Sequence, residues 1–346
     1  MFAVVSVERQ FVRPPEPQTL SSLARGGQRR LLLFGGRSHP DLVAKIAAQL
    51  ELEPGRVVVK TFSNGETYCR YEDSIRGADV FIVQSGCEPV DRNLMELFLM
   101  IQAAKLASAK RVTAVMPWFP YAKQDRKAKP REPISSRLVA DMLELAGADR
   151  ILCMDLHAGQ IQGFFRIPVD HMTCLPLFAE YFRSIGLSGP DVVAVAPDAG
   201  RAKYAERFAG MLGAGFGVIH KTHPSHDVSV VKAMVGDVEG KAAILYDDFA
   251  VTGWTNAGGV EALLQNGARE VWLAISHALF AEGGLERIED AGVTGIVVSD
   301  TVPLSPDVKS DKVTVLSTAP LLATTILNVF SDESVSAVFG HDNQLF

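Results

Sequence analysis

The sequence lacks the patterns that mark several common classes of protein. It has no apolar run of the ~18–20 residues that a membrane-spanning helix needs. It also lacks the G-x-x-x-x-G-K-[ST] motif of P-loop ATPases. Lysine and arginine are scattered along the chain and the formal net charge is −6, so no basic patch suggests a nucleic-acid partner. We therefore expect neither a membrane protein nor a nucleic-acid-binding protein.

Cysteine is scarce as well. The four cysteines, Cys69, Cys87, Cys153 and Cys174, lie far apart and form no C-x-x-C pair. This spacing excludes the usual zinc motifs and gives no disulfide framework. We interpret them as reduced structural residues, which predicts a cytoplasmic protein.

The sequence does contain an alternation of strand-like and helical segments along most of its length. The chain has 346 residues, of which 47% are hydrophobic, and single cores stop growing near ~250–300 residues, so we predict two domains. Strand-like apolar runs alternate with helical patterns, as in parallel sheets with crossover helices. We predict a poorly ordered extension over residues 1–28 and two α/β domains over 29–172 and 173–346, with the C-terminal end packing on the first domain. The predicted strands are 31–34, 57–62, 79–84, 112–117, 151–156, 191–196, 215–220, 241–248, 271–276 and 295–299.

Two adjacent carboxylates, Asp247 and Asp248, end one of these apolar runs. Ligands of open parallel sheets bind at the carboxyl ends of the strands, which is where this pair lies. Carboxylates accept hydrogen bonds from sugar hydroxyls. The alternative is that the two aspartates only end a strand and cap the following helix.

A Thr-Gly-x-Thr loop follows the acid pair and opens a helical segment. Backbone N–H groups around Gly253, the hydroxyls of Thr252 and Thr255, and the positive end of the helix together suit a phosphate monoester. The preceding carboxylates would repel a bare phosphate, so a sugar phosphate fits this stretch better than an inorganic anion.

Other polar loops follow predicted strands. The Asn-Gly pair within 62–67 is typical of a tight turn. The basic segment 121–131 is either solvated surface or a clamp for polyphosphate. His157 and Asp198 could share a hard divalent ion, although either residue alone is more often an ordinary hydrogen-bonding residue.

Several short motifs occur in order along the chain. They are FSNGE at 62–66, NLMEL at 93–97, YAKQDR at 121–126, REPI at 131–134, MDLHA at 154–158, QIQGFF at 160–165, PVDH at 168–171, and the Asp247-Asp248 pair with its Thr-Gly loop. Together they resemble the ribose-phosphate diphosphokinases, also called phosphoribosyl diphosphate synthetases, over residues 32–339.

The resemblance implies a fold and a reaction. The fold is two tandem phosphoribosyltransferase-like domains, each a parallel sheet flanked by helices. In the reaction, the anomeric hydroxyl of ribose 5-phosphate attacks the β-phosphorus of ATP, and AMP is released. The resemblance also implies Mg²⁺ as cofactor and a homo-oligomer of dimers that stack into a hexamer.

The resemblance further implies a role for each matching residue. Lys221 would be a mobile-loop lysine that closes over the phosphates, with His223 beside it, and His157 and Asp198 would serve magnesium. The remaining implied sites are an adenine pocket at Phe62, Asn64 and Glu66 that is completed across a subunit contact, ATP contacts at Lys123, Gln124 and Asp125, and a ribose 5-phosphate site at Asp247, Asp248, Thr252, Gly253 and Thr255.

The chain departs from the family pattern at several positions in or next to the expected substrate-binding sites. A lysine in place of arginine at a phosphate clamp loses the bidentate fork. A bulky residue at Trp254 would be strained at positive φ and would block a close approach. The family usually has Arg at Lys123, a second Gly at Arg201, Arg at Tyr204 and at His223, Asp at Val251 and Gly at Trp254.

These departures leave rival functions to weigh. We favour an active enzyme with altered kinetics, because the acid pair, His157, Asp198 and Lys221 are all retained. One alternative is a weakly active or non-catalytic homologue that binds and regulates a fuller synthetase. A phosphoribosyltransferase shares the acid-pair loop, but the motifs at 62–66 and 160–165 argue against it.

Overall fold

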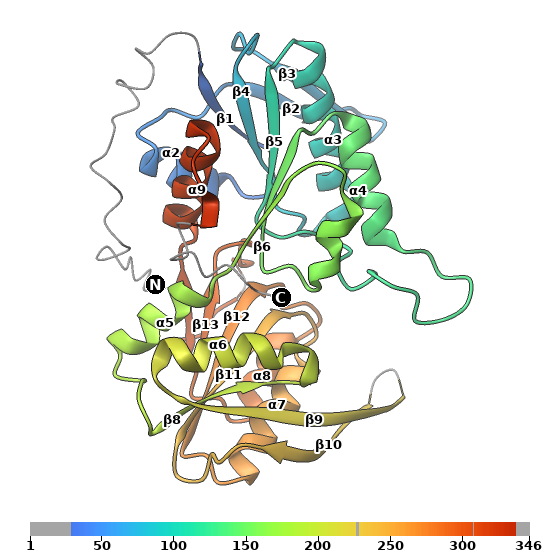
Figure 1. Ribbon diagram of the computed structural model, residues 1–346. Coiled ribbons are helices and arrows are strands. Elements are labelled where there is room, and N and C mark those ends of the chain that lie inside the picture. The colour runs from blue at the N-terminus through green and yellow to red at the C-terminus, as the bar shows by residue number, and fades with distance from the viewer. Residues whose placement is uncertain (1–28, 226–227, 307, 337–346) are drawn as a thin grey trace.

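The computed structural model describes residues 29–225, 228–306 and 308–336, and only the backbone of the described residues between 220 and 233. The predicted extension, residues 1–28, lies outside this range. The chain forms two helix-covered sheets, one above the other in Figure 1, and a small separate hairpin. None of the described helices is both long and apolar enough to span a membrane.

The first sheet is entirely parallel and is covered by helices on both faces. Alternate residues of its second strand point to opposite sides: Phe81 and Val83 join one hydrophobic core, and Val80 and Ile82 join another. The strand order is β1 (Leu31–Gly35), β4 (Asp79–Val83), β5 (Arg111–Met116), β6 (Arg150–Met154) and β7 (Val169–Met172), and the helices between them are α2 (Pro40–Gln49), α3 (Val90–Leu106) and α4 (Ser135–Ala146).

The second sheet is parallel except for one edge strand, β10. Its strand order is β10 (Val228–Val235), β9 (Gly215–Ser225), β8 (Val192–Ala196), β11 (Ala242–Ala250), β12 (Glu270–Ala278), β13 (Gly295–Ser299) and β14 (Val313–Leu316). Its helices are α5 (Leu175–Ser184), α6 (Ala202–Leu212), α7 (Trp254–Gln265) and α8 (Gly284–Asp290), and α9 (Ala319–Ser331) ends the described fold. All nine residues of β11 are buried, as expected for a central parallel strand.

The prediction for residues 57–62 is wrong in one respect. They form a strand, β2 (Val57–Thr61), but it pairs antiparallel with β3 (Thr67–Tyr71) and does not join the parallel sheet. The Asn-Gly turn is confirmed, since Gly65 has φ +91° and its N–H donates to the carbonyl of Phe62 at 2.9 Å. A glycine suits this position because it adopts positive φ without strain.

Segments far apart in sequence lie side by side around the first sheet. Helix α9 lies against α2 in Figure 1, and both contribute to the same hydrophobic core. Just after α9, Asp332 pairs with Arg111 at the start of β5 at 2.9 Å. The end of the described chain therefore packs against the first sheet, not the second. The boundaries between domains remain a prediction.

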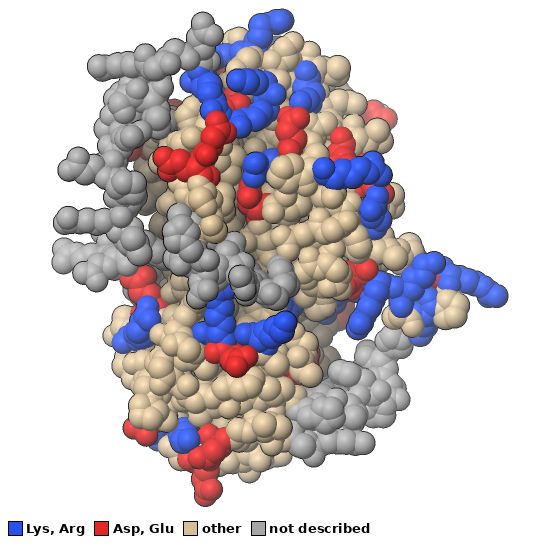
Figure 2. All heavy atoms as spheres, in the orientation of Figure 1, with Lys and Arg blue, Asp and Glu red and all other residues tan. Residues whose placement is uncertain are grey.

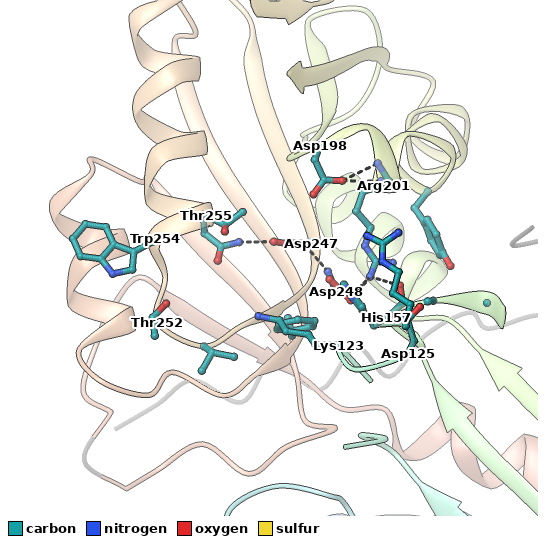
Figure 3. Close-up of a pocket in the computed structure, with 18 of the residues that line it drawn as sticks. Lys123, Asp125, His157, Asp198, Arg201, Asp247, Asp248, Thr252, Trp254 and Thr255 are labelled. Atoms are coloured by element: carbon teal, nitrogen blue, oxygen red, sulfur yellow. Dashed lines mark hydrogen bonds and ion pairs between the residues drawn. The ribbon is translucent and has the colours of Figure 1, made fainter. Parts of the chain in front are cut away.

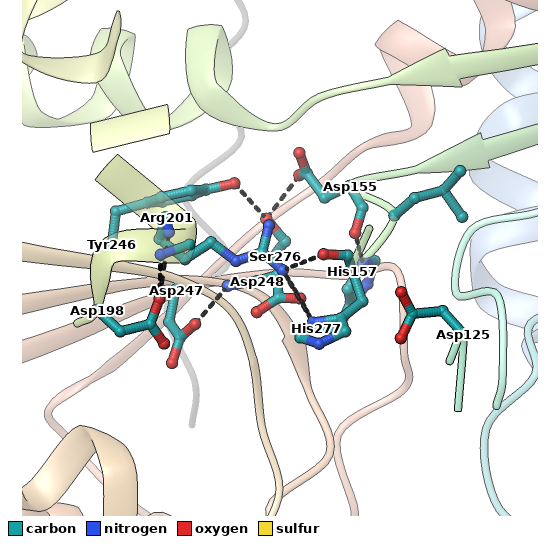
Figure 4. Close-up of polar contacts among 12 residues, drawn as sticks. Asp125, Asp155, His157, Asp198, Arg201, Tyr246, Asp247, Asp248, Ser276 and His277 are labelled. Atoms are coloured by element: carbon teal, nitrogen blue, oxygen red, sulfur yellow. Dashed lines mark hydrogen bonds and ion pairs between the residues drawn. The ribbon is translucent and has the colours of Figure 1, made fainter. Parts of the chain in front are cut away.

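A buried polar network joins the two sheets (Figure 4). Asp155, which follows β6, accepts hydrogen bonds from Ser276 Oγ on β12 at 2.6 Å and from the backbone N–H of Cys174 at 2.8 Å. His277 Nε2 lies 3.3 Å from the Asp155 carbonyl oxygen. These contacts fix the carboxyl ends of strands from both sheets against each other.

Charged side chains of both signs are interspersed over the face shown in Figure 2. Basic side chains gather on the projecting loop between β5 and α4, which contains the segment 121–131. Part of that loop faces the cleft described below.

Candidate active site

One cleft of about 610 Å³ lies where the carboxyl ends of strands from both sheets meet. The loops after β5, β6, β8 and β11 line it, and most of its polar side chains point inward (Figure 3). The structure brings together nine of the predicted site residues on its walls: Lys123, Asp125, His157, Asp198, Asp247, Asp248, Thr252, Gly253 and Thr255.

The acid pair lies at the cleft end of β11, and both carboxylates are almost fully buried. Asp247 Oδ2 accepts a hydrogen bond from Asn256 Nδ2, and Asp247 Oδ1 accepts one from the backbone N–H of Asp248, each at 3.0 Å. Burial, and then the neighbouring Asp248 carboxylate, raise the pKa of Asp247 well above its usual range. The two aspartates therefore do not share the charge equally.

Asp248 is the ionised member of the pair because two groups hold its carboxylate. Arg201 forms an ion pair with Asp248 Oδ2, and His157 Nδ1 lies 2.7 Å from the same oxygen. Burial alone would raise the pKa of Asp248, but Arg201 and His157 outweigh it and hold that pKa below its usual range. Figure 3 shows the three side chains pointing toward one another.

These contacts orient the imidazole ring of His157. Arg201 Nη2 has two hydrogens, and its best acceptors are Asp248 Oδ2 and the carbonyl oxygen of His157 at 2.9 Å. His157 Nδ1 is directed at Asp248, so Nε2 is the ring nitrogen of His157 that remains available to a metal.

The two residues assigned to magnesium by resemblance fit an ion that arrives with a nucleotide. Asp198 Oδ1 accepts from the backbone N–H groups of Gly200 and Arg201 at 2.8 and 3.2 Å. Within the part of the chain that the structure describes, Asp198 Oδ2 and His157 Nε2 make no hydrogen bond, and no three His, Cys, Asp or Glu side chains could hold a metal by themselves. Mg²⁺ commonly binds through one or two protein ligands together with substrate phosphates.

The Thr-Gly loop is tightly packed against the start of α8. Gly253 has φ +73°, and a Cβ at this position would lie 2.3 Å from the carbonyl oxygen of Gly284, so only glycine fits. The strain expected at Trp254 is not found: it is the first residue of α7 and does not have positive φ. Its ring is 61% exposed and lies 4.0 Å from Arg287 Cζ, while Arg287 Nη1 donates to the carbonyl of Thr252.

The loop after β5 supplies another part of the cleft wall. Lys123 Nζ lies 4.2 Å from the ring centroid of Phe249, and desolvation lowers the pKa of Lys123 although Asp248 and Asp247 oppose the shift. Asp125 accepts a hydrogen bond from Gln160 Nε2. The first residues of the basic segment 121–131 therefore belong to the cleft and are not merely solvated surface.

Several predicted site residues are not on the cleft walls. Phe62, Asn64 and Glu66 lie exposed at the β2–β3 turn. Gln124 uses its side-chain oxygen to accept from Ser135 Oγ at 2.5 Å and so serves the start of α4. Lys221 and His223 lie in β9, and their side chains are outside the described part of the structure.

Other residues of the cleft were missed as site residues. The sequence singled out Arg201 only as a departure, and a basic residue three positions after Asp198 was the available signal. Gln160 lies within a quoted motif, and Asn256 lies one residue beyond the Thr-Gly loop. The missed residues that line the cleft include Arg126, Gln160, Arg201, Lys203 and Asn256.

Comparison with known proteins identifies the family. Two family models match: the N-terminal domain of ribose phosphate pyrophosphokinase at residues 31–147, and the phosphoribosyl synthetase-associated domain at residues 231–340. A ribose-phosphate pyrophosphokinase of Corynebacterium efficiens is 46% identical over 318 residues, which cover 91% of this chain and 97% of that relative. The chain belongs to the ribose-phosphate pyrophosphokinase family. A ribose-phosphate pyrophosphokinase of Caldanaerobacter subterraneus is also 46% identical, over 89% of this chain and 98% of its own length.

The fold agrees with this membership. The crystal structure of phosphoribosylpyrophosphate synthetase from Mycobacterium smegmatis matches with a TM-score of 0.82 at 43% identity, over 88% of this chain and 99% of that one. The predicted fold class, two tandem phosphoribosyltransferase-like domains with helix-flanked parallel sheets, is confirmed for this member of the ribose-phosphate pyrophosphokinase family.

Proposed function

We propose that this chain transfers the diphosphoryl group of ATP to the anomeric hydroxyl of ribose 5-phosphate, giving 5-phosphoribosyl 1-diphosphate and AMP. The observation that carries the proposal is the shared cleft. The second sheet contributes the acid pair and the Thr-Gly loop, and loops of the first sheet contribute Lys123, Asp125 and His157. Relatives named ribose-phosphate pyrophosphokinase, similar over nearly the whole chain, support the same reaction.

Ribose 5-phosphate would bind along the acid pair and the loop that follows it. The positive end of α7 and the backbone N–H groups beyond Gly253 suit the 5-phosphate, with the hydroxyls of Thr252 and Thr255 beside them. Asp248, held ionised, would accept hydrogen bonds from the ring hydroxyls. The pair would fix the orientation of the sugar and would not act as a general base.

ATP would lie against the loop after β5, with its phosphates toward Lys123. We assign Mg²⁺ to His157 Nε2 and Asp198, where the ion would neutralise the charge of the polyphosphate. Lys221, from β9, would close over the phosphates. The contact with Asp248 orients the His157 ring for this role, and hydrogen bonds from two backbone N–H groups orient the Asp198 carboxylate.

The adenine pocket would be completed by a second copy of the chain. Phe62 is 43% exposed at the β2–β3 turn, outside the cleft of its own chain, and Asn64 and Glu66 are exposed beside it. This placement suits residues that serve a pocket across a subunit contact. Together with the family resemblance, this placement leads us to propose a homo-oligomer in which dimers stack into a hexamer, and the reduced cysteines lead us to propose that it is cytoplasmic.

No observation within the described residues favours the regulatory alternative. The departure at Lys123 keeps a cation in the cleft, Tyr204 is buried with its ring stacked on Tyr246 at 6.4 Å between centroids, and Trp254 packs on Arg287 without closing the cleft. These positions modify the walls and leave the acid pair intact.

Product analysis tests the reaction directly. The purified chain is incubated with ATP, magnesium and ribose 5-phosphate, and the nucleotides are separated by chromatography. We expect AMP that forms only when the sugar phosphate is present. ADP as the only nucleotide product would mean ordinary kinase or ATPase chemistry, and no turnover together with altered activity of an added synthetase would support the regulatory alternative.

A further inference from the structure

Arg201 is the least expected residue of the cleft. It is the last residue of the short 3-10 turn that Asp198 caps, and only 4% of it is exposed. A charged side chain is almost never buried to this degree unless it is paired. The family resemblance gives glycine at this position, so the guanidinium is a feature of this chain that the proposed roles do not use.

The guanidinium occupies the space between the acid pair and the magnesium residues. Nη2 pairs with Asp248 Oδ2 and donates to the carbonyl oxygen of His157 at 2.9 Å. The backbone N–H of Arg201 donates to Asp198 Oδ1 at 3.2 Å. One residue therefore contacts two residues assigned to magnesium and one assigned to the sugar. Figure 4 shows Arg201 at the centre of this group.

Charge matching explains why such a group is stable there. A buried carboxylate needs a nearby positive charge, which either a divalent ion or a basic side chain supplies. Here the guanidinium lies at hydrogen-bonding distance from Asp248. The cleft walls carry four basic side chains, Lys123, Arg126, Arg201 and Lys203, and four acidic ones, Asp125, Asp198, Asp247 and Asp248. Because burial favours the neutral form of Asp247, the negative charges on these walls do not exceed the positive ones before any substrate or ion enters.

We propose that Arg201 is a built-in cation that occupies the place of a free divalent ion beside Asp248, so that metal enters this cleft only with the nucleotide. The inference deepens the proposed function, because it concerns the ions that the same reaction uses. Arg201 acts as a positioning residue: it holds Asp248 for the sugar hydroxyls, and through Asp248 it keeps Nε2 of His157 turned toward the nucleotide side.

Manganese binding tests the inference without any turnover. Mn²⁺ replaces Mg²⁺ as the probe, and free Mn²⁺ is followed by electron paramagnetic resonance in titrations of the full-length protein without nucleotide. We expect the wild type to take up no Mn²⁺ that depends on the acid pair. Arg201→Met removes the charge while keeping an unbranched side chain, and should raise the affinity for Mn²⁺ at least about tenfold, since a like charge at contact distance is removed. Arg201→Lys, which keeps the charge, should behave as the wild type.

Asp247→Asn in the wild-type background identifies the site of any uptake. Wild-type Mn²⁺ binding that Asp247→Asn weakens would overturn the inference, as would a folded Arg201→Met that gains no affinity. If Arg201→Met does not fold, the inference is still tested by comparing Mn²⁺ binding to the wild type with Mn²⁺ binding to Asp247→Asn. When ATP is added, we expect the wild type to bind Mn²⁺ together with the nucleotide.

A kinetic measurement separates this inference from the proposed function. At fixed metal-bound ATP, the wild-type rate should not change when free Mg²⁺ is raised, whereas the rate of Arg201→Met should rise with it. Failure to form AMP at all would refute the proposed function and leave the Mn²⁺ result standing. A wild-type rate that rises with free Mg²⁺ and loses this rise in Asp247→Asn would refute the inference alone.

Discussion

The adjacent aspartates of the acid pair should respond unequally to the same substitution. Asp248→Asn removes the charge that faces the buried guanidinium of Arg201, and breaking one side of a buried ion pair costs about 3–5 kcal/mol. Asparagine keeps one acceptor oxygen for Arg201, so we expect the lower end, about 3 kcal/mol. For a domain of this size, each kcal/mol shifts the melting midpoint by roughly 2–4 °C, which gives a fall of roughly 6–12 °C.

Asp247→Asn should change stability by less than about 1 kcal/mol. Burial already favours the neutral form of Asp247, so the amide removes no stabilising charge. The hydrogen bond to Asn256 can be kept, because the Asn256 side chain can rotate and offer its oxygen in place of its nitrogen. The substitution also ends the repulsion between neighbouring carboxylates.

Thermal unfolding without ligands, followed by circular dichroism, measures both variants. Asp237→Asn is a matched control, because Asp237 pairs with Lys241 on the surface at 3.0 Å and its side chain is 72% exposed. Such a pair contributes about 0–1 kcal/mol. Equal losses for the two acid-pair variants, or a larger loss for Asp247→Asn, would refute the assignment of the charge to Asp248.

Three further outcomes are expected. Asp247→Asn should weaken binding of ribose 5-phosphate more than binding of ATP, as measured by calorimetry, and equal losses would count against the sugar site. Lys221→Ala should lower turnover by roughly 10²–10³ with an unchanged melting midpoint, and unchanged turnover would remove Lys221 from the mechanism. Burial lowers the pKa of His171 to about 4, where Nε2 accepts from the backbone N–H of Leu156 at 2.8 Å. The unfolded chain therefore gains a proton first as pH falls below about 6.5, and the wild type should lose about 2 kcal/mol more than His171→Asn between pH 7 and 5, measured by urea unfolding. Parallel losses in the two proteins would contradict the burial of a neutral histidine.

The strands that sequence predicts well are those buried on both faces. β4 and β11 are buried at every residue, so they read as continuous apolar runs. β7 was missed because it is an edge strand with the sequence VDHM, two of whose four residues are only partly buried. β2 was placed in the wrong sheet because its run of valines resembles that of a buried strand. The run itself carries no information about its partner.

The acid pair and its loop were predictable because their residues are consecutive and lie at a strand end. Arg201 was not, since its contacts join residues 44 and 47 positions away in the chain. No local pattern says that the turn after β8 folds its third residue toward β11 and the loop after β6. The residues at 62–66 show a different limit of prediction. Their motif is easy to recognise in the sequence, but a single chain does not contain the pocket that they are expected to line.

Arg201 also changes what the departures mean. From the sequence, the departures stood only as positions where the usual family residue is absent, among them the glycine expected at Arg201. In the structure that position supplies a cation to Asp248, and Asp248 in turn orients His157. The residue at one cleft position thus influences the charge of a second residue and the orientation of a third. The site is therefore better understood as a rebalanced set of charges than as a site with groups removed, and the metal requirement is where the difference should be measurable.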